Sequence, residues 1–144
     1  MPRIITREQL KEIRSLHKNL EHAMERRAFL FEKATGTAID MSGEKVKTSP
    51  TDKHALLMAA LADLDMEIER KAESLRTEKE KALRAFAEAG FESEEHEIMY
   101  YRYIACLDWR DITEIMFWSR SYVLRKHGTA LRKLDTLRNT KKRA

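Results

Sequence analysis

The sequence predicts an all-α protein, in which a long N-terminal helical hairpin of the coiled-coil type precedes a C-terminal helix-turn-helix domain of three helices. Four glycines and two prolines in 144 residues are too few for the many turns of an all-β chain. Apolar residues recur every three or four positions over long stretches, as they do along one face of an amphipathic helix. Charge and aromatic content change near residue 93, which divides the chain into a hairpin, 1–92, and a second domain, 93–144.

The first helix is predicted over about 6–33. Thr6 is a suitable N-cap, and Gln9 stands three residues later, where its side chain can complete a capping box. The inward stripe of this helix is predicted to hold Leu10, Ile13, Leu16, Leu20, Met24 and Phe31.

The second helix is predicted to begin near Thr51 or Asp52, just after Pro50, and to end at Gly90. Lys71 and Glu78 interrupt its apolar stripe. The stripe consists of Leu57, Leu61, Leu64, Ile68, Leu75, Ala82 and Phe86. We therefore expect an antiparallel hairpin that also pairs between chains, which gives a homo-oligomer and favours a dimer.

The connection between these helices, residues 35–50, is long for a loop inside a compact domain. Loops of this length tend to be functional or disordered, and we expect disorder or contact with a partner here. The run Gly43-Glu44-Lys45 does not fit a phosphate-binding loop, because that motif needs Gly-Lys-Ser/Thr entering a helix directly after a strand, and no strand precedes it here.

Three further helices are predicted in the C-terminal third. Ser93 opens the first, which has acidic residues in its first turn and runs to Leu107. Asp108 caps a second helix of about two turns. Ser119 caps the third, 119–137, whose inward face is predicted to hold Val123, His127, Ala130 or Leu131, and Leu134. Two short helices and a longer basic one form a helix-turn-helix pattern, whose last helix fits the major groove of DNA.

Charge supports a nucleic-acid partner. The net charge is +4, but residues 1–93 hold 17 basic and 17 acidic side chains, so the excess lies beyond them. Residues 119–144 carry nine basic residues against one acid, Asp135, and eight of the eleven aromatic residues fall between 91 and 122. Clustered basic residues gain binding free energy by releasing the counterions that condense on phosphates. We expect double-stranded DNA as the partner.

Two sets of side chains are predicted to contact the DNA. The face opposite Val123 and His127 at the start of the last helix presents residue types that read base edges, namely Arg120, Ser121, Tyr122 and Arg125. Other basic residues are better placed for phosphates: Arg110, Lys126, Arg132, Lys133, Arg138, Lys141, Lys142 and Arg143.

No pattern predicts an enzyme, a metal site or a cofactor. The five histidines include no i,i+4 pair, and no Glu-x-x-His spacing occurs. We interpret Glu94-Glu95-His96-Glu97 as a solvated first turn, Cys106 as a small buried core residue and His127 as a packed histidine. No apolar run approaches the roughly 20 residues of a membrane span, and Met1 to Thr6 lacks a secretory apolar core. A cytoplasmic location in a bacterial host is expected.

Several runs in the C-terminal third carry a family resemblance. They are Tyr101–Ile104, Leu107, Trp109 and Ile112, then Ser119-Arg120-Ser121-x-Val123 and His127-Gly128-x-Ala130-Leu131. Together they resemble the C-terminal region of a family of small bacteriophage and prophage proteins, mostly of unknown function or described as transcriptional regulators. The helix-turn-helix of that family is similar to region four of sigma factors. Lys47-Thr48-Ser49 with Asp52-Lys53, and the helix that follows, resemble the linker and second coiled-coil helix of the same family.

The resemblance implies a phage-type DNA-binding regulator, acting on late or morphogenesis genes. Three residues bear on it. Phe117 stands where Gly or Asn is usual, so we expect the turn to be built by packing of Phe117 and Trp118 rather than by a left-handed residue. Lys126 stands where sigma-like recognition helices often have an apolar residue. Gly128 matches the family's His-Gly pair, and close approach by a neighbouring helix is its expected reason.

Three functions remain open. The first is a sequence-specific transcriptional regulator that oligomerises through its hairpin, so that two helix-turn-helix units read two half-sites. The second is the DNA-recognition subunit of a phage packaging machine, which assembles as a ring. The third is a coiled-coil adaptor that binds a host protein such as RNA polymerase. The first is the function that we expect.

Overall fold

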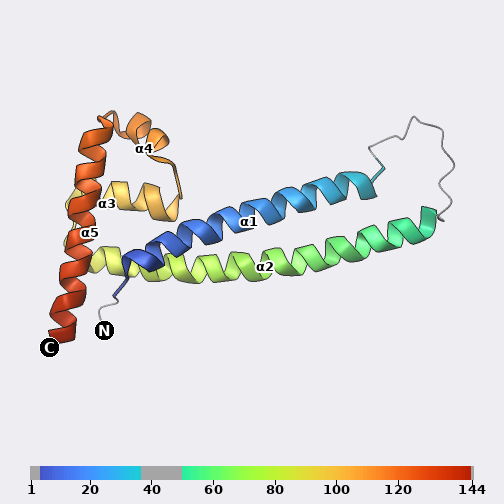
Figure 1. Cartoon of the computed structure of the whole chain (residues 1–144), viewed down its shortest axis with the longest axis horizontal. Coiled ribbons are helices and arrows are strands. Elements are labelled where there is room, and N and C mark those ends of the chain that lie inside the picture. The colour runs from blue at the N-terminus through green and yellow to red at the C-terminus, as the bar shows by residue number, and fades with distance from the viewer. Residues whose placement is uncertain (1–3, 37–49, 144) are drawn as a thin grey trace. The chain divides into compact units, whose positions relative to one another are not determined.

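The computed structural model describes residues 4–36 and 50–143, and the side chains of residues 50, 51 and 141–143 are outside this description. Within these ranges the chain is all-helical (Figure 1). It contains five α-helices and one π-helical turn, and no strand occurs among the described residues. The elements are α1 (Arg7–Ala34), α2 (Pro50–Glu88), α3 (Ser93–Met99), the π-turn η1 (Tyr100–Ile104), α4 (Trp109–Met116) and α5 (Arg120–Arg143).

The two long helices begin and end close to where the sequence predicts. The Thr6 N–H donates to Gln9 Oε1 at 2.8 Å and the Gln9 N–H donates to Thr6 Oγ1 at 3.1 Å, which confirms the capping box. Gly36 and Gly90 follow α1 and α2 with φ of 70° and 71°. This left-handed conformation ends a helix, and glycine adopts it without a steric penalty. Most of the predicted loop, 35–50, lies outside the described residues.

The chain divides into two compact units that do not coincide with the segments 1–92 and 93–144. One unit, which we call the C-terminal unit, contains residues 1–17 and 74–144, and the other, which we call the helix pair, contains residues 18–73. The start of α1 belongs to the C-terminal unit because its apolar side chains are buried there, Leu10 and Ile13 fully. Arg7 also pairs with Asp135 of α5 at 2.6 Å.

The helix pair buries little. Ala23 and Leu61 are its only buried apolar side chains among the described residues. Met24 and Phe31 were predicted to face inward, and this prediction is wrong, because they are 54% and 49% exposed. Ala23, three residues after Leu20, continues the inward face of α1 in this unit. Met24 and Phe31 therefore lie at the side of that face.

In the C-terminal unit, α3, α4 and α5 surround a small core of Ile98, Ile112 and Val123. Half-buried apolar side chains pack against it: Tyr101, Leu107, Trp109, Met116 and Trp118. The helix from Ser93 was predicted to reach Leu107, but the α-helix ends at Met99 and widens into η1. The Ala105 N–H donates to the Tyr100 carbonyl, five residues back, at 3.0 Å.

Cys106 closes this helix instead of filling the core. Its backbone is left-handed, with φ of 57°, and its side chain is half-buried, with Sγ 3.4 Å from the Tyr103 carbonyl oxygen. The prediction of a small buried core residue is therefore wrong.

Among the described residues, no helix combines the length and apolarity needed to cross a bilayer.

Candidate nucleic-acid interface

The segment from α4 to α5 turns at Phe117. Phe117 has φ of 57° and ψ of 34°, the left-handed conformation, and its side chain is 91% exposed. The expectation that aromatic packing of Phe117 would replace a left-handed residue is therefore wrong. Trp118 alone packs here, edge-on to Tyr122 with ring centroids 4.9 Å apart. Ser119 caps α5 as predicted, because its Oγ accepts the Tyr122 N–H at 3.2 Å.

The inward face of α5 holds the predicted residues. Val123, Ala130, Leu131 and Leu134 are buried. His127 is a packed histidine, as predicted: its Nε2 lies 2.8 Å from the Tyr103 hydroxyl, and the ring of Trp109 meets it edge-on at 4.7 Å. Burial, followed by the nearby Arg102 and Arg7, lowers the pKa of His127 to about 4. The imidazole is therefore neutral near pH 7.

Two arginines hold the end of η1 against α4. Arg14 Nη1 donates to the carbonyls of Arg102 (2.8 Å) and Leu107 (3.0 Å), and Arg102 Nη1 also donates to the Leu107 carbonyl (3.2 Å). The Arg102 guanidinium lies 4.2 Å from the Trp109 ring. Cations are favourable at the carbonyl end of a helix. This bracing fixes the start of α4, and with it the position of the turn.

Of the four predicted base-reading residues, three stand on the exposed surface of the first turns of α5. Arg120, Ser121 and Arg125 are exposed. Tyr122 is half-buried, and its hydroxyl donates to Glu94 Oε2 of α3 at 2.9 Å. That hydrogen bond raises the pKa of the Tyr122 hydroxyl. The structure thus separates Tyr122 from the other three and places it against α3.

Acidic residues at the start of α3 engage two of the predicted phosphate-binding lysines. Lys126 Nζ lies 3.2 Å from Glu92 and 3.9 Å from Glu94, and Lys133 Nζ lies 2.5 Å from Glu95 Oε1. Both ammonium groups therefore neutralise charge within the protein. This intramolecular pairing reduces the positive charge that the +8 of residues 119–144 suggested.

Glu95 is buried, so the interpretation of Glu94 to Glu97 as a solvated first turn is wrong for this residue. Burial raises the pKa of its carboxyl, but hydrogen bonds from the Lys133 ammonium and the Glu92 N–H outweigh burial and hold the pKa below its usual value. Glu95 stands three and four residues before Ile98 and Met99, so all three lie on one face of the helix. This spacing could have shown from the sequence that Glu95 lies on the buried face.

The other predicted phosphate residues differ in their surroundings. Arg110 is exposed and lies 3.4 Å from Glu114, one turn along α4. Arg132 is exposed and donates to Thr129 Oγ1 at 3.2 Å. Arg138 is half-buried on the inward face, where its Nε has no hydrogen-bond partner among the described residues. The side chains of Lys141, Lys142 and Arg143 lie outside the described part of the chain.

Gly128 is not approached closely by a neighbouring helix. A Cβ built at this position would have Arg132 Nη1 at 3.7 Å as its nearest contact, an ordinary van der Waals distance. The expected reason for this glycine, close approach by another helix, is therefore wrong. Ser121, Arg125, Gly128 and Arg132 follow one another at three- and four-residue steps and share one face of α5.

In the described residues, no group of three or more His, Cys, Asp and Glu side chains could hold a metal ion. Comparisons with protein-family models, with curated proteins and with solved structures each found no match.

Proposed function

We propose that this chain is a sequence-specific regulator that binds double-stranded DNA, with α4 and α5 forming a helix-turn-helix and α5 entering the major groove. The observation that carries this proposal is the exposed start of α5. There Arg120, Ser121 and Arg125 stand on the surface while the opposite face of the same helix is buried. Arginine pairs bidentately with guanine in the major groove, and serine adapts to several bases.

The surrounding charges support the same function. Arg132 extends the exposed face of α5 toward its C-terminal half, and Arg110 lies on α4, the helix that crosses the backbone in such motifs. Both suit phosphate contacts, which position a protein on DNA without reading sequence. Lys126 and Lys133 contribute less, because Glu92, Glu94 and Glu95 hold them.

The resemblance to bacteriophage and prophage regulators with a sigma-like helix-turn-helix belongs to this proposal, as does a bacterial cytoplasmic location. So does a dimer that joins two copies through the helical hairpin of α1 and α2. A single helix-turn-helix contacts few base pairs, and two joined copies read two half-sites with a spacing that the dimer sets.

Selection of bound fragments from random DNA, followed by fluorescence anisotropy on the selected sequence, tests the proposal. Arg120→Ala and Arg125→Ala are each expected to cost about 1–3 kcal/mol on that sequence and to relax base preference. Arg110→Ala is the matched control, because an exposed phosphate contact weakens selected and random DNA alike.

Two outcomes contradict the proposal. One is an Arg120→Ala variant that loses equal affinity for selected and random DNA, which removes Arg120 from the base-reading set. The other is no binding at about 50 mM salt, where phosphate contacts are strongest. The absence of binding would favour the adaptor function, whereas DNA binding by a ring of about eight or more subunits would favour the packaging function.

A further inference from the structure

The helix pair, residues 18–73, exposes more apolar surface than two helices can cover. Half of the twelve large hydrophobic side chains exposed in the described part of the chain belong to it. They are Met24, Phe29, Phe31, Leu56, Met58 and Met66. An amphipathic helix is stable when its apolar face packs on another layer, and a single pair leaves both flanks uncovered.

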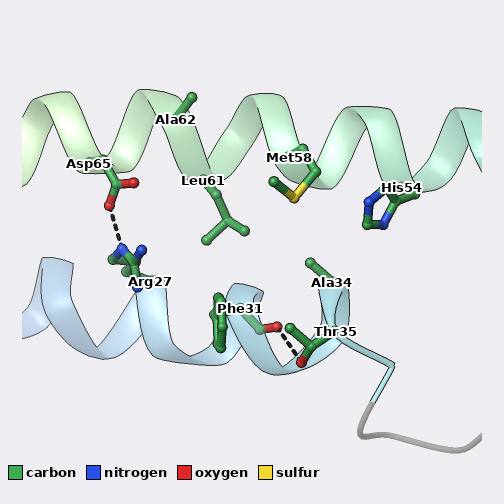
Figure 2. Close-up of a pocket in the computed structure, with 9 residues that line it drawn as sticks. All are labelled: Arg27, Phe31, Ala34, Thr35, His54, Met58, Leu61, Ala62 and Asp65. Carbon is green, nitrogen blue, oxygen red and sulfur yellow. Dashed lines mark hydrogen bonds and ion pairs between the residues drawn. The ribbon is translucent and has the colours of Figure 1, made fainter.

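One flank of the helix pair contains an apolar groove of about 370 Å³. Figure 2 shows Phe31 of α1 with Met58 and Leu61 of α2 lining it, and the ion pair between Arg27 and Asp65 beside them. Ala34 and Ala62 add small side chains to the lining. A groove between large and small apolar residues fits the knobs of a packing helix.

A second apolar depression of the helix pair lies mainly on α1. Glu25, Arg26, Phe29 and Leu30 of α1 line it, with Leu64 alone from α2. The Lys33 ammonium lies 4.7 Å from the centroid of the Phe29 ring. The Phe31 groove instead has five lining residues on α2 and three on α1, so a partner seated in it contacts both helices of the pair.

We propose that the Phe31 groove is a dimer interface, in which the helix pair of a second copy packs face to face and completes a four-helix bundle. The charges favour this occupant and its orientation. Residues 18–34 of α1 carry four basic and three acidic side chains, whereas residues 52–73 of α2 carry three basic and six acidic ones. Residues 18–34 of one copy are therefore complementary in charge to residues 52–73 of the second copy, and the reverse pairing is equally favourable.

Only one orientation uses this complementarity. A two-fold axis parallel to the helices places α1 of each copy over α2 of the other, with Ala34 of both copies at one end of the bundle. The chains then leave the bundle together at the other end. A two-fold axis across the helices places α2 over α2, with acid-rich segments facing each other, and like charges disfavour it. This pairing supplies the interface for the dimer of the proposed function, although it does not require DNA.

Light scattering of the purified full chain, with and without Phe31→Lys, tests the interface. The wild type is expected to be a dimer, and the variant a monomer at the same concentration. Phe29→Lys is the matched control, because it introduces the same charge into the same helix outside the groove, and this variant is expected to remain a dimer. Met58→Lys on α2 repeats the test from the other side of the groove. Circular dichroism establishes that each variant keeps its helical content.

A monomeric wild type overturns the proposal and assigns the groove to another partner. Dissociation by Phe29→Lys with an intact Phe31→Lys dimer also overturns it, because the interface is then the other flank. A dimer that survives Phe31→Lys and Met58→Lys has the same consequence. A monomer that still binds DNA leaves the proposed function standing, and a dimer that binds no DNA leaves the interface standing.

Spin labels test the orientation. With Cys106→Ser removing the native thiol and Ala72→Cys carrying the label, the proposed bundle separates the two labels by about 20 Å, the width of two helix layers. A two-fold axis across the helices at the groove, near Leu61, separates them by about 30 Å or more, because Ala72 lies eleven residues from the axis in each copy. A single long distance in a dimer would overturn the proposed orientation.

Discussion

The two compact units differ most in what they bury. Fifteen of the seventeen buried apolar side chains of the described residues lie in the C-terminal unit, and two lie in the helix pair. The first unit therefore has a core of its own, whereas the second has long helices with both flanks exposed. Helix length alone does not make a stable region, because most helical stability comes from packing of the apolar face.

The ion pairs of the two units differ in the same way. Glu95 pairs with Lys133 in the C-terminal unit, and the carboxylate side chain there is 1% exposed. In the helix pair, the Arg27 and Asp65 side chains are 39% and 52% exposed. The same chemistry has different energetic weight at the two sites, because water screens the second pair more than the first, in which the carboxylate is buried.

Removal of Lys133 is the strongest test of this difference. Lys133→Met leaves the Glu95 carboxylate buried with only the Glu92 N–H to compensate it, so the free energy of unfolding is expected to fall by about 3 kcal/mol. The pKa of Glu95 is expected to rise in the folded variant. Urea unfolding measures the first effect, and titration followed by carboxyl NMR shifts measures the second.

Arg132→Met is the control for Lys133→Met. It removes the neighbouring cation from an exposed position, where substitutions change stability by about 0.5 kcal/mol or less. Equal losses from the two variants would show that Glu95 does not depend on Lys133, and the contrast between buried and exposed pairs would fail.

Acid is expected to destabilise the C-terminal unit through His127. Its folded pKa, about 4, lies below the ordinary value of 6.5, so the unfolded chain takes up the proton first as pH falls. The stabilisation is complete above about pH 6.5 and is lost as pH falls from 6.5 to 4. The imidazole is partly exposed, so the expected loss is about 2 kcal/mol rather than the full value that the shift implies.

Urea midpoints between pH 7 and pH 4 measure this loss. His127→Gln keeps a side chain able to bond the Tyr103 hydroxyl but does not titrate, so its stability is expected to change less over the same range. If the urea midpoint of His127→Gln falls with pH as steeply as that of the wild type, another group is responsible for the acid sensitivity.

The sequence predicted the helices well where a strong local signal marks their ends. Thr6 with Gln9, Ser119, and Gly90 are such signals, and all three mark helix ends in the structure. Cys106 and Phe117 gave no signal, because each adopts a left-handed backbone that glycine or asparagine usually takes. Periodicity does not reveal such a conformation, because it reports which face of a helix a side chain occupies and not the backbone angle of one residue.

The candidate interface was predictable in part for a similar reason. Helical spacing alone separates Arg120, Ser121 and Arg125 from the buried face of α5. Spacing within α5 cannot show which residues of another helix pack against it. Tyr122, Lys126 and Lys133 were therefore expected on the DNA surface. Each is held by a glutamate near the start of α3, about 30 to 40 residues away in sequence.

Phe117 offers a smaller test of how the C-terminal unit is held. Its left-handed backbone costs free energy, and its side chain is too exposed to return any by burial. Phe117→Gly is therefore expected to raise the free energy of unfolding by about 1 kcal/mol. Phe117→Ala removes the same ring but keeps the strained backbone, so thermal unfolding of the two variants separates the backbone from the ring. If Phe117→Gly and Phe117→Ala are equally stable, the left-handed backbone at this position does not destabilise the protein.

The smallest effect is expected at the ion pair of the helix pair. Arg27→Gln keeps the length of the side chain and removes its charge, but both partners are exposed and salt screens their attraction. Side-chain entropy regained by the freed Asp65 offsets what remains. Urea unfolding at physiological ionic strength is therefore expected to show no measurable change when Arg27→Gln is added to the monomeric Phe31→Lys variant.

In the wild-type dimer the same substitution is expected to cost stability, because Arg27 and Asp65 line the Phe31 groove and lose water when a second copy covers it. A loss that remains in the Phe31→Lys background would belong to the single helix pair. No loss in either background would mean that this ion pair stays in water in the dimer.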